Sequence, residues 1–262
     1  MERKGLLVVS FGTTYPDTRE KSIGALEKAL KEAYPKHIFY RAYTSGMIRK
    51  KLREEEGVKV PSVSEALKQM LQDGITELLV QPTHIIPGIE NDRMIEEIRN
   101  QKKRFSSVLI GRPLLGNVKD YKPAIHAVLS DIDEELWKNQ ENTALVFMGH
   151  GSEHEANAAY AKLQEEFSTK YPNIYMGTVE GTPDFQDVQK ALKEKPYKKI
   201  VLKPFMIVAG DHARNDMAGE EKGSWKSILE SQGYEVTCIL KGLGENPHIQ
   251  RLFIAHSKEA AQ

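Results

Sequence analysis

Two histidines and one glutamate in the second half of the chain are the residues best suited to metal chemistry. His150 stands between two glycines, Glu180 precedes a glycine, and His212 follows a Gly-Asp pair. Each comes just after a short apolar run typical of a β-strand. Two imidazoles and a carboxylate accept Fe²⁺, Co²⁺, Ni²⁺ or Zn²⁺, and three protein ligands leave coordination positions open. The set predicts an open metal site, which can release its ion or share it with a substrate.

Alternating strands and helices are expected to position these residues. Short apolar runs predict strands at 6–11, 38–43, 77–81 and 107–110 in the first half, and at 144–148, 174–179, 199–203 and 236–240 in the second. Amphipathic segments predict helices at 17–34, 64–72, 91–102, 119–137 and 248–256. This alternation favours parallel sheets that are covered by helices on both faces.

The two halves resemble each other in an ordered series of matches. The segment 82–88 (Pro-Thr-His-Ile-Ile-Pro-Gly) parallels 204–210 (Pro-Phe-Met-Ile-Val-Ala-Gly), and Tyr34-Pro35 parallels Tyr171-Pro172. We therefore predict an α/β fold of two similar doubly wound lobes, each with a four-stranded parallel sheet flanked by helices. The lobes are expected at 1–139 and 140–262, the second carrying the metal site. An active-site cleft is expected between them, because ligands of open parallel sheets bind beyond the carboxyl ends of the strands.

Differences between the halves mark the candidate site. Phe11 is replaced by His150, Glu90 by His212, and the segment 43–45 by 178–180, which ends in Glu180. Neighbouring strands lie about 5 Å apart, so these three strand ends can bring their side chains to one ion. Taken singly, each residue has an ordinary structural explanation, as a turn, a helix start or a solvated charge. Their placement at equivalent strand ends favours the metal site.

Composition narrows the class of protein. Basic and acidic residues are equal at 37 each, so nothing indicates a nucleic-acid partner. The single cysteine, Cys238, excludes a disulfide framework and a cysteine zinc site. The apolar run 6–11 is too short for a secretory signal, and no run is long enough to cross a membrane, so a cytoplasmic protein without a membrane partner is expected. The glycines around His150 do not complete a dinucleotide fingerprint, and no organic cofactor is expected.

The sequence resembles the class II chelatases, in particular the anaerobic sirohydrochlorin cobaltochelatases of the CbiK type. The segments that carry the resemblance are 7–14 (Leu-Val-Val-Ser-Phe-Gly-Thr-Thr), 147–154, 179–183 and 206–217, in family order along essentially the whole chain. The resemblance implies insertion of cobalt(II) into sirohydrochlorin in anaerobic, early-insertion cobalamin synthesis, with the divalent metal as a substrate. The ligand set leaves iron and nickel open as alternative metals. The resemblance places the family's metal-binding residues on His150, Glu180 and His212, and a further active-site acid on Glu90.

The residues suggest how such a site would work. His150 is expected to bind the metal and accept a proton, while Glu90 on the opposite lobe relays protons. Other strand-end residues are candidates for substrate binding: Phe11, Thr13, His84, Gly88 and Arg214. His84 lies in an apolar run and is also explained by packing, and Arg214 by a solvated helix start.

Other functions remain open from the sequence alone. The same ligand set fits a ferrochelatase-type enzyme that inserts iron into sirohydrochlorin or a porphyrin. It also fits a protein that binds a tetrapyrrole or a metal without turnover, or a hydrolytic metalloenzyme with Glu90 as its base. A small homo-oligomer is possible.

Overall fold

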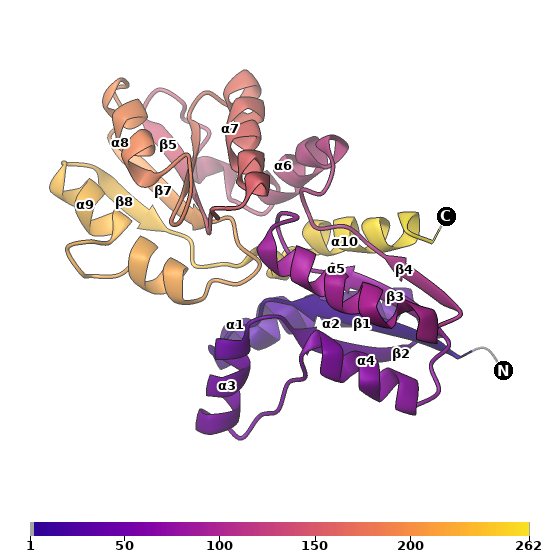
Figure 1. Cartoon of the computed structure of the whole chain (residues 1–262). Coiled ribbons are helices and arrows are strands. Elements are labelled where there is room, and N and C mark those ends of the chain that lie inside the picture. The colour runs from indigo at the N-terminus through magenta and orange to yellow at the C-terminus, as the bar shows by residue number, and fades with distance from the viewer. Residues whose placement is uncertain (1–2, 262) are drawn as a thin grey trace. The chain divides into compact units, whose positions relative to one another are not determined.

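A four-stranded parallel sheet organises the first compact unit of the computed structural model, which describes residues 3–261. The strands run in the order β2-β1-β3-β4. Their bounds are β1 Lys4–Ser10, β2 Ile38–Tyr43, β3 Glu77–Pro82 and β4 Ser107–Ile110. Buried apolar residues in β1 and β3 place these strands at the centre, as expected for a parallel sheet covered on both faces. Figure 1 shows this sheet with its helices.

The second unit repeats the same sheet. Its order is β6-β5-β7-β8, again wholly parallel. The strands are β5 Thr143–Gly149, β6 Ile174–Thr178, β7 Lys199–Pro204 and β8 Glu235–Cys238. The central pair has the same register in both units, since Lys4 pairs with Glu77 and Thr143 with Lys199. The predicted fold class, two similar four-stranded α/β lobes, is confirmed.

Helices cover both faces of the first sheet. On one face, α4 and α5 bury residues such as Met70 and Met94 against the core residues Leu7 and Val80. On the other face, Leu30 of α2 packs with the strands. The helices of this unit are α1 Pro16–Thr18, α2 Ala25–Ala33, α3 Gly46–Glu55, α4 Val63–Gln72, α5 Ile89–Gln101 and α10 Pro247–Glu259. The predicted helix at 17–34 contains a π-helical turn, Arg19–Gly24, and α3 was not predicted.

The second unit has an equivalent pair of helical layers. Val188 of α8 and Leu229 of α9 join the core on one face of the sheet, and on the other Phe167 of α7 stacks on Phe147 with ring centroids 5.5 Å apart. The helices are α6 Tyr121–Leu129, α7 Ala158–Lys170, α8 Phe185–Lys193 and α9 Trp225–Ser231. A π-helical turn, His212–Met217, follows β7.

The boundary between the units differs from the predicted joint at 139/140. The first unit comprises 1–120 together with 247–262, and the second comprises 121–246. α6 lies in the first half of the sequence but belongs to the second unit. α10 lies in the second half of the sequence but belongs to the first unit. Apolar and polar contacts explain this exchange: Ile254 of α10 packs with the core of the first sheet, and Asn246 Nδ2 donates to Ala127 O of α6 at 2.6 Å.

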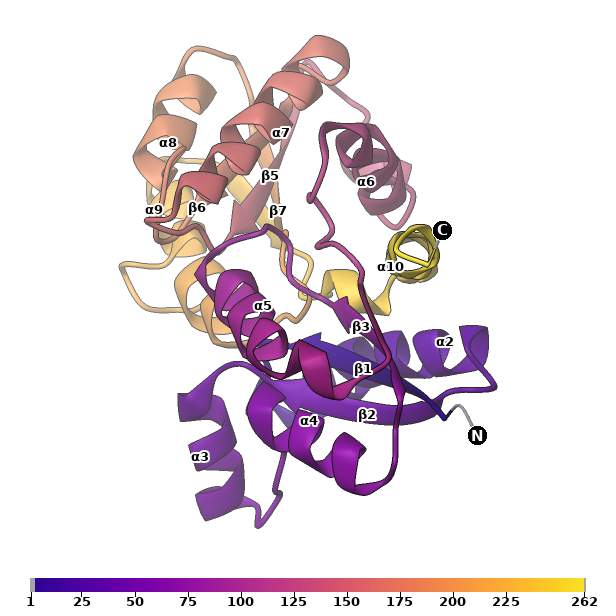
Figure 2. The ribbon, with the colours of Figure 1, turned by 45° about the vertical axis from the view of Figure 1, so that its right-hand side comes forward.

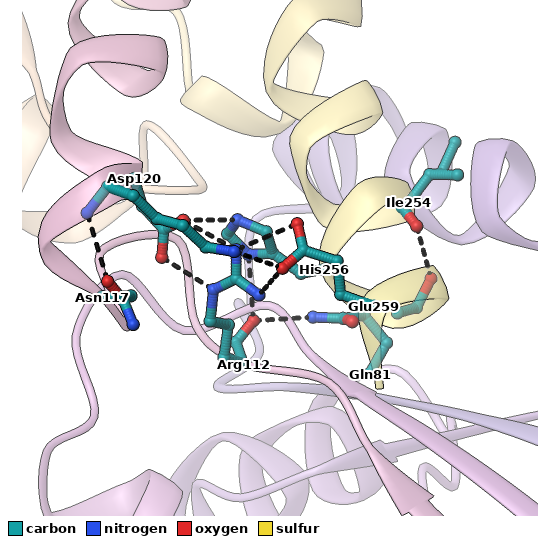
Figure 3. A network of polar contacts seen from close by, with 9 residues as sticks. Gln81, Arg112, Asn117, Asp120, Ile254, His256 and Glu259 are labelled. Atoms are coloured by element: carbon teal, nitrogen blue, oxygen red, sulfur yellow. Dashed lines mark hydrogen bonds and ion pairs between the residues drawn. The ribbon is translucent and has the colours of Figure 1, made fainter. Parts of the chain in front are cut away.

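A partly buried ion network also ties α10 to the first unit (Figure 3). Arg112, just after β4, donates to both carboxylate oxygens of Asp120, at 2.8 and 2.7 Å. Its third nitrogen donates to Glu259 of α10 at 2.9 Å. His256 of the same helix lies 3.3 Å from Asp120. These charge-assisted contacts hold α10 beside the strand that ends at Ile110.

The helix predicted at 119–137 is shorter in the structure. It begins with a 3₁₀ turn, Val118–Asp120, and α6 ends at Leu129. Ser130 Oγ donates to Ala127 O, a local bond that competes with helix continuation. Asp131 then forms an ion pair with Lys241. Among residues 3–261, none of the helices combines the length and the apolar character needed to cross a membrane.

Candidate metal centre

The two histidines and the glutamate singled out by the sequence lie together in the second unit. His150 follows β5, Glu180 follows β6, and His212 starts the π-helical turn after β7. These strands are adjacent in the sheet, in the order β6-β5-β7. One potential ligand atom from each residue lies within 4.8 Å of the others. The two imidazole rings are perpendicular, with centroids 4.8 Å apart.

Backbone contacts fix the distance between His150 and Glu180. The N–H of Glu180 donates to the carbonyl oxygen of His150 at 2.8 Å. The loop after β5 passes very close to the loop after β6 at Gly151. A Cβ at this position would lie 2.6 Å from the backbone nitrogen of Gly181. Gly151 also has a φ of 82°, where residues with a Cβ are strained. Glycine at this position therefore lets the two ligand loops approach each other.

Asn157 joins the same two loops through its side chain. Its Oδ1 accepts from the N–H of Ser152 at 3.0 Å, and its Nδ2 donates to the carbonyl oxygen of Thr182 at 2.8 Å. Ser152 follows the histidine loop and Thr182 follows the glutamate loop. One amide side chain thus bridges the segments that carry two of the three candidate ligands.

A carboxylate orients the second histidine. Nδ1 of His212 lies 2.5 Å from Oδ2 of Asp216, one helical turn along the chain. For His150, Nδ1 lies 3.1 Å from the carbonyl oxygen of Gly151 and 3.6 Å from Oε2 of Glu180. A hydrogen bond at Nδ1 leaves Nε2 with its lone pair for a metal. The arrangement suits two Nε2 ligands with carboxylates beside them.

Solvent reaches all three candidate ligands. The side chains of His150, Glu180 and His212 are 42%, 58% and 28% exposed, respectively. Structural metal sites are usually closed by four protein ligands, whereas sites that exchange ligands keep positions open. This centre can take up an ion from solution and still offer coordination positions to a second molecule.

The other sequence-predicted residues occupy strand ends of the first unit, Arg214 excepted. Phe11 directly follows β1 and is 42% exposed. Glu90 lies in the first turn of α5, where its carboxylate accepts from Arg93 at 3.1 Å. His84 follows β3, its ring nitrogens are inaccessible and lack partners among the described residues, and burial lowers its pKa to about 4. His84 therefore stays neutral near pH 7.

Three predicted substrate-binding residues have evident structural tasks. Thr13 is buried, and its Oγ1 accepts from the N–H of Tyr15 at 3.3 Å. Gly88 is the buried residue that precedes α5. Arg214 donates through Nε to the carbonyl oxygen of Ala209 at 3.2 Å. These contacts shape the turns after β1, β3 and β7, and substrate binding by these residues stays a prediction.

Sequence reasoning missed two residues of this centre, Asp216 and Asn157. A signal for Asp216 was present, because residues four apart on a helix face each other. For Asn157 the sequence carries no comparable signal, since its partners lie five and 25 residues away in different loops.

Comparisons with known proteins agree with this architecture. The "Sirohydrochlorin cobaltochelatase" of Salmonella typhimurium is 37% identical over 258 residues, covering 98% of this chain and 96% of its own length. The "Sirohydrochlorin cobaltochelatase CbiKC" of Nitratidesulfovibrio vulgaris is 29% identical, with coverage of 98% and 90%. The structure of SirB from Bacillus subtilis with Fe³⁺ shares the fold, with a TM-score of 0.67, 15% identity and coverage of 99% and 96%. The family described as cobalt chelatase (CbiK) matches residues 4–262, and this chain belongs to it.

Proposed function

We propose that this protein inserts cobalt(II) into sirohydrochlorin, as an enzyme of anaerobic cobalamin synthesis with early cobalt insertion. The observation that carries the proposal is the cluster of His150, Glu180 and His212 at three adjacent strand ends, in a chain of the cobalt chelatase family. The curated relatives that bear the name sirohydrochlorin cobaltochelatase support the same reaction.

The reaction defines what the residues must do. A divalent ion enters the macrocycle and two pyrrole N–H protons leave, so charge is conserved. His150 and His212 would hold the ion through Nε2, with Glu180 as the anionic ligand. Because three protein ligands leave positions open, the pyrrole nitrogens can bind the ion before the protein releases it. An open and solvent-accessible cluster suits an ion that is passed on in each turnover.

Proton removal needs acceptors close to the ring. His150 is the proposed acceptor, because imidazole exchanges protons near neutral pH once the ion has moved to the macrocycle. Glu90 is the proposed relay for protons, as a carboxylate at the start of α5. Its carboxylate accepts a hydrogen bond from Arg93 at 3.1 Å, which orients it at the start of α5.

The first unit offers an apolar surface suited to a flat macrocycle. Three exposed apolar side chains come from the ends of its adjacent strands: Phe11 after β1, Met47 at the start of α3 after β2, and Ile89 at the start of α5 after β3. Their exposed fractions are 42%, 68% and 41%. We propose that this surface contacts the ring, with Phe11 as the central residue.

A spectroscopic assay tests the function. Purified protein, cobalt(II) and sirohydrochlorin are mixed without oxygen, and the absorption change on metal insertion is followed. We expect His150→Ala and His212→Ala to lower the rate by at least about a hundredfold. His126→Ala, an exposed histidine of α6, is the matched control and should retain the parent rate. Parent-like turnover in the His150→Ala variant would refute the proposed site.

The same assay separates the remaining candidates. A ferrochelatase-type enzyme would insert iron(II) faster than cobalt(II) when the two are compared side by side, and nickel(II) completes the series. A protein that only binds its tetrapyrrole would saturate at one equivalent with no turnover. The cytoplasmic location, the absence of an organic cofactor and a small homo-oligomer stay predictions from the sequence.

A further inference from the structure

A groove in the first unit is lined by Pro87 and Asn91, which flank the proposed relay Glu90, and by residues farther along α5 and β4. It has a volume of about 400 Å³ and is lined by α5, β4 and the segment that follows β4. Pockets of roughly 300–1,000 Å³ hold small molecules in many proteins. None of the three candidate metal ligands lines it, since all of them belong to the second unit. α5 and β4 are labelled in Figure 1, and α5 is also labelled in Figure 2.

The floor of the groove is apolar. Ile95 and Ile98 of α5 face it from one side, and Val108 and Ile110 of β4 from the other. Ile98 is buried, whereas the other three are only partly buried and pack at the margin of the core. β4 is the edge strand of its sheet, so no further strand covers this side. The apolar margin can therefore receive the apolar part of a ligand.

Cationic side chains line the groove and no carboxylate does. Arg99 and Lys102 are both exposed at the end of α5, three residues apart, a spacing that places side chains on one face of a helix. Within residues 3–261, neither side chain has a hydrogen bond or an ion pair. Arg112 is the third cation, and its charge is already compensated by Asp120 and Glu259. Arg99 and Lys102 thus repel each other weakly, and an anion between them would relieve this repulsion.

A buried amide lies in the same lining. Asn91 of α5 is 4% exposed, and its Oδ1 has no hydrogen-bond donor among the described residues. A buried acceptor without a donor is rare in folded proteins and needs an explanation. This oxygen has almost no accessible surface, so a ligand in the groove does not reach it in this conformation. The groove itself offers an apolar floor and two uncompensated cations.

We propose that the groove binds a small amphipathic organic anion, with its apolar part on Ile95, Val108 and Ile110 and its anionic group between Arg99 and Lys102. The class is a carboxylate, sulfonate or phosphate joined to an aliphatic or aromatic body. None of the lining residues is a candidate metal ligand, and this inference goes beyond the proposed function.

Fluorescence binding tests the proposal on the full chain. The probe is 1-anilinonaphthalene-8-sulfonate, an aryl sulfonate whose emission rises in apolar surroundings. We expect saturable binding at one equivalent, with displacement by decanoate and much weaker displacement by decanol, which has the same chain without the charge. In the Arg99→Ala/Lys102→Ala variant the affinity should fall at least tenfold.

The matched control is Lys103→Ala/Arg104→Ala, which removes two adjacent exposed cations that do not line the groove. This variant should bind the probe within twofold of the parent. If both double variants lost the same amount of affinity for the probe, the probe would be attracted by the general positive charge at this end of the helix. This result would overturn the proposal. Unchanged binding in Arg99→Ala/Lys102→Ala, or equal displacement by decanol and decanoate, would also overturn it.

Discussion

From the contact between His212 and Asp216 we predict the effect of Asp216 on the Co²⁺ affinity of the proposed site. Replacing Asp216 by Asn removes the negative charge and keeps an oxygen acceptor at nearly the same place. The Nδ1–Oδ2 distance is 2.5 Å, as in a charge-assisted hydrogen bond, which makes the histidine a better ligand. Loss of such a partner typically lowers metal affinity about 10–100-fold, or about 1.4–2.8 kcal/mol. The Asp216 side chain is 48% exposed and screened by water, so we expect the lower part of this range.

Isothermal titration with Co²⁺ measures the dissociation constant directly. Asp211→Asn is the control, since Asp211 lies on the same turn but its Oδ1 accepts from Asn215. Both variants lose one negative charge near the centre, so a general electrostatic effect would weaken them equally. We expect Asp216→Asn to bind Co²⁺ about tenfold more weakly and Asp211→Asn to stay within twofold of the parent. Equal affinities in the two variants would refute an orienting role for Asp216.

Three further predictions concern the scaffold. Burial lowers the pKa of Lys203 to about 8, whereas the pKa of lysine in the unfolded chain is about 10.4. Between these two pH values the unfolded chain binds more protons than the folded protein. The free energy of unfolding should therefore rise as the pH is raised from about 8 to about 10.4. Lys203→Gln keeps an N–H donor and should abolish this rise in urea unfolding; an unchanged pH slope would contradict the reasoning. Gly151→Ala should lower both the melting temperature and the Co²⁺ affinity, whereas Gly233→Ala, with a φ of 93° and open space around it, should lower only the melting temperature. Arg112→Ala leaves Asp120 buried without its guanidinium and should cost about 3–5 kcal/mol in urea unfolding, and a loss below about 1 kcal/mol would show that the network carries no stability.

Strands were predicted well because the signal for each is local. The run 77–81 has three consecutive apolar residues, Leu78 to Val80, between Gly74 and Pro82, and the structure has β3 at Glu77–Pro82. The helix predicted at 64–72 corresponds to α4, Val63–Gln72, and it is followed by Gly74, which has a φ of 76°. Local patterns do not report which sheet a helix joins. The placement of α10 depends on Ile254 and on partners more than a hundred residues away, such as Arg112, so the sequence predicted the wrong side of the boundary for it.

The clustering of His150, Glu180 and His212 was predictable to the extent that it follows from sheet topology. The ends of adjacent parallel strands lie side by side, so residues just after β5, β6 and β7 had to be neighbours. The distances between them were not predictable, because they depend on the close passage of the turns at Gly151 and Gly181 and on the bridge made by Asn157. Comparing the two halves of the sequence reveals which side chains differ at equivalent positions. It does not reveal that Asn157 bridges the two loops that carry His150 and Glu180.

The two units show how a duplicated scaffold can keep its framework while its chemistry changes. In the second unit the N–H of Glu180 donates to His150 O at 2.8 Å, and in the first the N–H of Ser45 donates to Phe11 O at 3.2 Å. The glycine after each of these acceptors has a positive φ, 105° at Gly12 and 82° at Gly151.

The resemblance extends to the sheets. Gln81 and Lys203 occupy equivalent sites, and each donates to a backbone oxygen just beyond the edge strand, at 3.0 and 3.1 Å. A hydrogen bond to the backbone oxygen is therefore kept in both units, although the donor side chain is glutamine in one and lysine in the other. The backbone brings two loop residues together in both copies. A histidine and a glutamate in place of Phe11 and Ser45 therefore form a pair of candidate metal ligands. In the first unit, Phe11 stands at the position of His150. Its exposed phenyl ring suits contact with a flat ring rather than with an ion.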